Sequence, residues 1–239
     1  MGDFSVAVPT SGILTTDALL DESKPTWNVL SSAVDNTIYY SFSQTSLHPQ
    51  EVIDSQIMTE DQKNSTRQAL EYTASVTGIN FVENNDLLQV NWVFYIADII
   101  DPSWAAGVSI SDTSDQYGIS NEEAYSFIYI DELVSDISKG TSGYETLLHE
   151  IGHTLGLKHP FEGDITLPES LDNSDYTLMS YTDQGGIKTT FQQYDLDALE
   201  WMYGHDGLGG DSGYSAAGNE EPSSGTVPIE EENHAPIIV

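Results

Sequence analysis

The stretch that most constrains the fold is His149-Glu150-Ile151-Gly152-His153-Thr154-Leu155-Gly156-Leu157-Lys158-His159-Pro160. Residues four apart lie on one face of a helix, so His149 and His153 can direct both imidazoles at one ion. A continuing helix cannot bring His159 to the same ion. A left-handed glycine at position 156 can end the helix and reverse the chain. The pattern therefore predicts a helix that stops at Gly156 and three imidazoles that converge beyond it.

Three neutral imidazoles with an open fourth position are typical of a catalytic zinc site rather than a closed structural one. Glu150 follows the first histidine, so its carboxylate can reach a water on the ion without ligating the ion. The alternative interpretation is a set of exposed helix residues without a metal. Gly156 and His159 are two further constraints that this alternative does not require, and they favour the zinc site.

Composition narrows the classes of function further. The chain of 239 residues has 39 acidic and 6 basic side chains, a formal net charge of −33, and no cysteine. Nucleic-acid binders and proteins that dock on anionic lipid need basic side chains, so both classes are excluded. Disulfides and Cys-based zinc sites are excluded as well. No run of about 18 apolar residues is present, so we expect no membrane insertion.

The chain divides into three parts by composition. We expect an N-terminal segment over 1–24, either a pro-segment or an arm, and a catalytic domain over 25–206. Residues 207–239 are rich in Gly, Ser, Pro and acid, as solvated linkers are. This last part ends on Ile237-Ile238-Val239, which suggests the first strand of a further domain.

Strand patterns occur over 36–42, 79–82, 88–96, 107–110 and 126–130. One helix is predicted from a capping box at Thr59 and Gln62 to about Val76. A second is predicted to begin near Ser142, with Glu145 three residues later. A third is predicted over about 193–203, with Gly204 ending it. Because strands and helices mix without strict alternation, we expect an α+β domain with a mixed twisted sheet.

A second segment, Tyr176-Thr177-Leu178-Met179-Ser180-Tyr181, completes a known pattern. A histidine motif of this spacing followed by a methionine turn is typical of the metzincins. The chain resembles this clan of zinc endopeptidases and, within it, the serralysin group of secreted bacterial proteases, which Pro160 after the third histidine favours. Similarity is looser at Trp27, at Thr37 to Phe42 and from Tyr194 to Gly204.

The resemblance implies a metzincin-like catalytic domain with an active-site helix and a C-terminal helix after the Met turn. It implies that His149, His153 and His159 bind Zn²⁺, with Tyr181 as a further ligand that swings away to stabilise the oxyanion. Glu150 would be the general base towards the zinc-bound water. Met179 would underlie the site.

The predicted function is therefore a secreted, extracellular zinc endopeptidase that acts on protein or peptide substrates, as a monomer within a longer multidomain chain. The alternative is an adhesin-associated binding module with little turnover. Serralysins continue into glycine- and aspartate-rich repeats that bind calcium. In this chain only Gly209-Gly210-Asp211 resembles part of such a repeat, so Ca²⁺ is a possible additional ion. For the substrate we expect a sheet edge at Ala105 to Val108, with an ordinary internal strand as the alternative.

Overall fold

A computed structural model describes residues 8–22, 26–30, 36–43, 52–86, 89–99, 107–112, 125–208 and 212–214. The strands are β1 (Thr37–Ser41), β2 (Val52–Gln56), β3 (Asn80–Glu83), β4 (Trp92–Ile99), β5 (Gly107–Asp112) and β6 (Tyr125–Asp131). The helices are α1 (Leu14–Asp17), α2 (Trp27–Leu30), α3 (Glu60–Thr77), the 3-10 turn η3 (Glu132–Val134), α4 (Ser142–Leu155) and α5 (Gln193–Tyr203).

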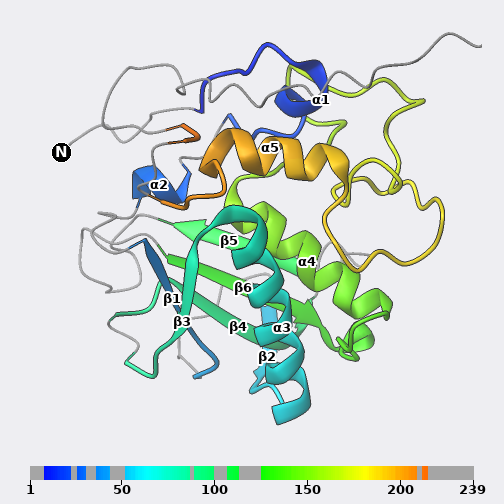
Figure 1. Ribbon diagram of the computed structural model, residues 1–239. Helices are drawn as coiled ribbons and strands as arrows, with labels where there is room; N and C mark the ends of the chain where they lie inside the picture. The colour runs from blue at the N-terminus through cyan, green and yellow to red at the C-terminus, as the bar shows by residue number, and fades with distance from the viewer. Residues whose placement is uncertain are drawn as a thin grey trace, which may run out of the picture.

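The described strands form one mixed sheet in the order β3-β1-β4-β6-β5, with β2 pairing with β4 off this path. The pairs β1/β3, β1/β4 and β4/β6 are parallel, whereas β5/β6 and β2/β4 are antiparallel. In Figure 1, α3 and α4 lie in front of this sheet. This arrangement confirms the predicted α+β class with a mixed sheet.

Strand β4 shows why the sheet has two apolar faces. Successive side chains of a strand point to opposite faces. One set, including Trp92, Phe94 and Ile96, joins the core cluster that also contains residues of α3, α4 and α5. The other set, including Val93 and Tyr95, belongs to a second cluster with residues of β6. The sheet is thus a buried layer on which the helices are fixed.

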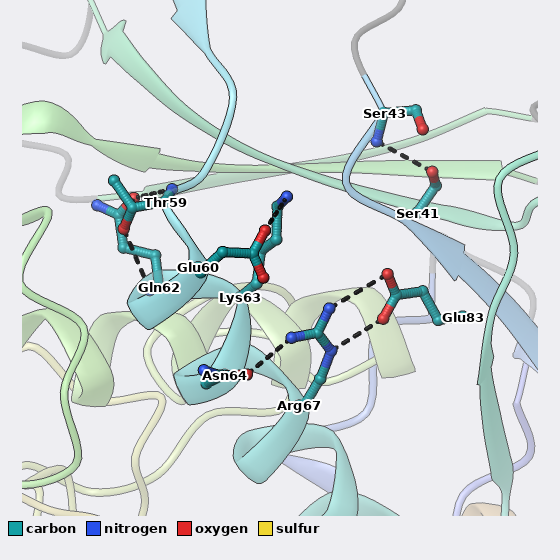
Figure 2. A network of polar contacts seen from close by, with 9 residues as sticks. All are labelled: Ser41, Ser43, Thr59, Glu60, Gln62, Lys63, Asn64, Arg67 and Glu83. Carbon is teal, nitrogen blue, oxygen red and sulfur yellow. Dashed lines mark hydrogen bonds and ion pairs between the residues drawn. The ribbon is translucent and has the colours of Figure 1, made fainter.

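Helix α3 begins and ends as the sequence predicts. Thr59 and Gln62 form a reciprocal capping box, and Gly78 ends the helix at φ +72°. Figure 2 shows the same cap together with the bidentate pair between Arg67 and Glu83, at 2.9 and 3.3 Å, which joins α3 to β3. The helix is therefore held to the sheet by an ion pair at its exposed side as well as by its apolar face.

Three elements of the structure, β2, α1 and α2, were not expected from the sequence. Helix α4 begins at Ser142, as the sequence predicts, and its N-cap is Thr141, whose hydroxyl accepts a hydrogen bond from the Tyr144 N–H. Glu145 does not complete a capping box, because its carboxylate instead accepts a hydrogen bond from the Lys188 N–H at 3.1 Å.

The boundaries of the predicted parts lie against the core. Leu19 and Leu20 of the N-terminal segment are buried, and so is Leu208 of the predicted linker. The Tyr214 N–H donates to the Trp201 carbonyl at 3.0 Å. Packing therefore continues on both sides of the predicted 25–206 domain, while residues 215–239 lie outside the described residues.

The proposed substrate edge is described only in part. Ala105 and Ala106 lie outside the described residues, whereas Gly107 and Val108 begin β5. Strand β5 stands at the end of the described strand order and pairs with β6, and α4 packs against it. The described part of this segment thus lies beside the helix that carries the first two histidines.

Candidate active site

The site is built on α4 and on the turn that ends it. Gly156 adopts φ +106°, and its N–H and that of Leu157 donate to the carbonyls of His153 and Gly152. A left-handed residue at this position costs least when it is glycine. The helix therefore stops where the sequence predicts, and the chain turns back towards the face of α4 that carries the half-buried His149 and His153.

The three histidines converge. The Nε2 atom of His159 lies 3.2 Å from that of His149 and 3.0 Å from that of His153. Among the described residues they are the group of His, Cys, Asp and Glu side chains placed closely enough to hold one metal ion. The left-handed turn at Gly156 thus reverses the chain, and a loop histidine reaches the two helix histidines.

The opposite ring nitrogens show which tautomer the geometry favours. Nδ1 of His149 lies 2.9 Å from the Leu178 carbonyl, and Nδ1 of His153 lies 2.9 Å from the Leu157 carbonyl. A carbonyl only accepts, so each Nδ1 carries the proton and each Nε2 presents a lone pair. Burial also lowers the pKa of His149 to about 4, which keeps its imidazole neutral. Lone pairs about 3 Å apart repel one another unless a cation lies between them.

Met179 lies beneath the helix. It is fully buried, and its Sδ lies 2.8 Å from the point where a Cβ on Gly152 would stand. A side chain at position 152 would therefore displace the Met179 side chain. Sequence reasoning did not single out Gly152, although a glycine inside a helix is a signal of close packing.

A buried carboxylate fixes the Met turn. Asp195, at the start of α5, accepts hydrogen bonds from the Thr177 hydroxyl at 2.6 Å, the Leu178 N–H at 2.7 Å and the Gln192 N–H at 2.8 Å. Burial raises its pKa to about 6. Because the Leu178 carbonyl faces His149, Asp195 contributes to the orientation of the first histidine. Its helix N-terminal position was the signal in the sequence, and its role was missed.

Glu150 and Tyr181 lie at the same site. Glu150 is 4% exposed within α4. The residue Tyr181 is 57% exposed, and its ring centroid lies 4.4 Å from that of His159 and 6.0 Å from that of His149. Partial burial raises the pKa of Tyr181, and the charge of Glu150 raises it further. The tyrosine therefore keeps its proton and can donate a hydrogen bond.

Phe161 adds an aromatic wall that the sequence did not suggest. Its ring stacks on His159 at 5.1 Å with an interplanar angle of 6° and lies 5.3 Å from Tyr181. Both Phe161 and Tyr181 are exposed. An apolar surface beside the three histidines is open to solvent.

No helix among the described residues is both long and apolar enough to cross a membrane. No family model matches the chain. Curated serralysins are nevertheless similar to it. The serralysin of Photorhabdus laumondii is 30% identical over 192 residues, which is 69% of this chain and 38% of the relative. The serralysin of Proteus mirabilis is 29% identical over 173 residues, 60% of this chain and 34% of the relative.

A shorter match occurs with the metalloprotease AprA of Pseudomonas entomophila, which is 36% identical over 85 residues, 27% of this chain and 18% of the relative. The chain thus spans little more than a third of the length of the serralysins it matches. The mixed sheet with its helices and the similarity to several serralysins agree with each other. Together they identify this chain as a serralysin-like metzincin domain.

Proposed function

We propose that the chain is a zinc-dependent endopeptidase domain in which His149, His153 and His159 hold the metal. The observation that carries this proposal is the convergence of three Nε2 atoms, 3.0 and 3.2 Å apart. Two of these histidines donate their Nδ1 protons to carbonyl oxygens, as metal-ligating histidines usually do. Zinc bound there would supply a Lewis acid and a water of lowered pKa.

The residues of the chain would handle the protons. Glu150 is held in α4 directly after His149, where its carboxylate accepts a proton from the attacking water and delivers it to the leaving amine nitrogen. Tyr181, which keeps its phenol proton, donates a hydrogen bond to the carbonyl oxygen as negative charge develops. Tyr181 would also serve as the further metal ligand at rest, as the resemblance to serralysins implies.

The substrate would be an extended protein or peptide segment. Strand β5 ends the described sheet order beside α4, and a strand in that place can add an extended peptide by main-chain hydrogen bonds. Phe161 and Tyr181 offer exposed aromatic surface to its side chains. This arrangement favours binding across the histidine site, along β5.

The wider setting follows from the resemblance. We propose that the domain acts outside the cell as a monomeric part of a longer protein. Calcium binding stays a prediction, since the described residues offer one close group of metal-ligating side chains, the three histidines.

Casein cleavage and zinc content of the wild type and of Glu150→Ala test the proposal. We expect one zinc per chain in both proteins, and a loss of about 10²–10⁴-fold in cleavage rate for the variant, as for other general bases. Glu200→Ala, an exposed carboxylate on α5, is the matched control and should cleave like the wild type. A wild type that binds zinc and cleaves nothing would favour the binding-module alternative. Full activity of Glu150→Ala would refute the assigned base.

A further inference from the structure

Lys158, the residue before His159, is a buried lysine, only 8% exposed. A buried ammonium is costly unless its protons are all hydrogen-bonded. Lys158 Nζ donates to three carbonyl oxygens: Glu162 at 2.6 Å, Ala18 at 2.7 Å and Ile165 at 2.9 Å. Three donors thus meet three acceptors, so the side chain is fully satisfied in one conformation.

These contacts join two segments that are far apart in the sequence. The N–H of Lys158 donates to the Leu19 carbonyl at 2.8 Å, and the Asp21 N–H donates to the Gly156 carbonyl at 2.9 Å. Leu20 and Leu157 form an antiparallel bridge between them. The residues from Gly156 to Lys158 therefore pair with the N-terminal segment, and the ammonium extends this pairing into the loop after His159.

Within that loop the ammonium fixes Glu162. The Glu162 N–H donates to the His159 carbonyl at 3.1 Å, while the Glu162 carbonyl accepts from Lys158. The carboxylate Oε1 then lies 3.0 Å from His159 Nδ1. Nδ1 of His159 is buried and makes no regular hydrogen bond among the described residues, so this carboxylate is the polar group that faces it. Glu162 is the third oxygen partner, after the carbonyls that face His149 and His153.

We propose that Lys158 is a positioning residue for His159. Its ammonium holds the Glu162 backbone so that the carboxylate faces Nδ1 of His159 and directs Nε2 towards the other two histidines. This inference rests on the proposed zinc site, and it assigns the N-terminal residues around Ala18 to the support of that site. Outer partners of metal ligands typically change metal affinity by 10–100-fold when they are removed.

Competition with a chromogenic zinc chelator tests the proposal in Lys158→Met, Lys158→Arg, Glu162→Gln and the wild type. Lys63→Met is the matched control, because Lys63 is a lysine of α3 that pairs with Glu60 and, among the described residues, makes no ion pair with the histidines. We expect Lys158→Met to raise the zinc dissociation constant by about 10–100-fold and Glu162→Gln by about 10-fold. Lys158→Arg, which keeps charge and donors, should restore part of the loss, and Lys63→Met should change nothing.

Two further measurements separate positioning from a general structural role. The visible spectrum of the cobalt-substituted protein should change in Lys158→Met and in Glu162→Gln, because the geometry at His159 changes. The kcat for casein should fall more than KM changes. A metal-free Lys158→Met that melts lower while its zinc affinity and cobalt spectrum stay those of the wild type would overturn the proposal.

Glu162 keeps the test decisive if Lys158→Met does not fold. Its side chain is 54% exposed, so Glu162→Gln should fold normally. Wild-type zinc affinity and cobalt spectrum in that variant would overturn the proposed carboxylate contact. If the wild type binds zinc but cleaves no substrate, the endopeptidase function is refuted, and the ratios of the zinc dissociation constants of the variants to that of the wild type still test this inference. If the wild type is active and these ratios are one, this inference alone is overturned.

Discussion

The two sides of the histidine site are built differently. His149 and His153 stand on α4, and their Nδ1 atoms face backbone carbonyls, those of Leu178 and Leu157. His159 stands on a loop, and its Nδ1 faces the side-chain carboxylate of Glu162. A regular helix fixes the spacing of the first two ligands, while the third depends on side chains that hold a loop.

The comparison shows where the site is robust and where it depends on particular side chains. Backbone partners on the helix side persist through most substitutions. On the loop side one ammonium, that of Lys158, holds three carbonyl oxygens. We therefore expect disturbances of the metal and its outer partners to appear first on the loop side.

Metal removal should give the largest effect. Zinc at a thousand times its dissociation constant stabilises the folded state by about 4 kcal/mol, so exhaustive chelation should lower the melting temperature and re-added zinc should restore it. In hydrogen exchange, protection should be lost in residues 157–167 and largely kept in α4. Equal loss of protection in the loop and in α4 would break the comparison between the two sides.

Much of this arrangement was predictable from the sequence because it depends on local rules. The capping box at Thr59 and the glycines at 156 and 204 fix helix ends through local hydrogen bonds and backbone conformation. The histidine spacing then places two ligands on one helix face. These features need no knowledge of distant residues.

The features that were missed depend on contacts between distant residues. Ala18 and Lys158 meet across the chain, and so do Gly152 and Met179 or Asp195 and Leu178. No periodicity records such pairs. Strand β2 was missed for the same reason, since its antiparallel pairing with β4 is a tertiary contact and not a local sequence pattern.

On the helix side, Asp195→Asn should be the most disruptive substitution outside the ligands. The carboxylate of Asp195 now accepts hydrogen bonds from one O–H and two N–H groups. Asparagine keeps one acceptor oxygen, but its NH₂ group is a donor and would face one or more of these donors. Each hydrogen bond lost to a charged group costs about 1.5–3 kcal/mol. Chemical denaturation of the metal-free protein measures the loss, and the control is Asp197→Asn, at a half-buried carboxylate of α5 that accepts from the Gln193 side chain.

The effect of Asp195→Asn should depend on pH. Burial raises the pKa of Asp195 to about 6, above its ordinary value. Between these two values the folded protein holds a proton on Asp195 that the unfolded chain has already released. The contribution of Asp195 to stability therefore falls as pH rises from about 4 to about 6 and is constant above. The destabilisation by Asp195→Asn should shrink over that range. A constant difference between variant and wild type would contradict the raised pKa.

Gly152→Val should cost somewhat less, about 1–3 kcal/mol, because the new side chain meets the end of a flexible one. Met179 Sδ must move away from the new side chain, and we expect the repacking to disturb the Met turn. The measurement is the melting temperature together with zinc affinity, and both should fall. Glu71→Val on the exposed side of α3 reports the helix cost of valine alone; equal effects at the two positions would mean that the Met turn does not depend on Gly152.

The smallest expected effect is that of salt, and it lies outside both sides of the site. The acidic side chains that give the net charge of −33 repel one another. Raising the ionic strength from 0.1 to 1 M shortens the screening length from about 10 to about 3 Å and weakens this repulsion. The melting temperature should rise, by roughly 2–4 °C for each 1 kcal/mol gained. Buried charges are screened much less. The ratio of zinc dissociation constants between wild type and Lys158→Met should therefore stay constant as sodium chloride increases. A ratio that falls towards one would mean that Lys158 acts through long-range charge, and the loop side would then differ from the helix side in electrostatics rather than in hydrogen bonding.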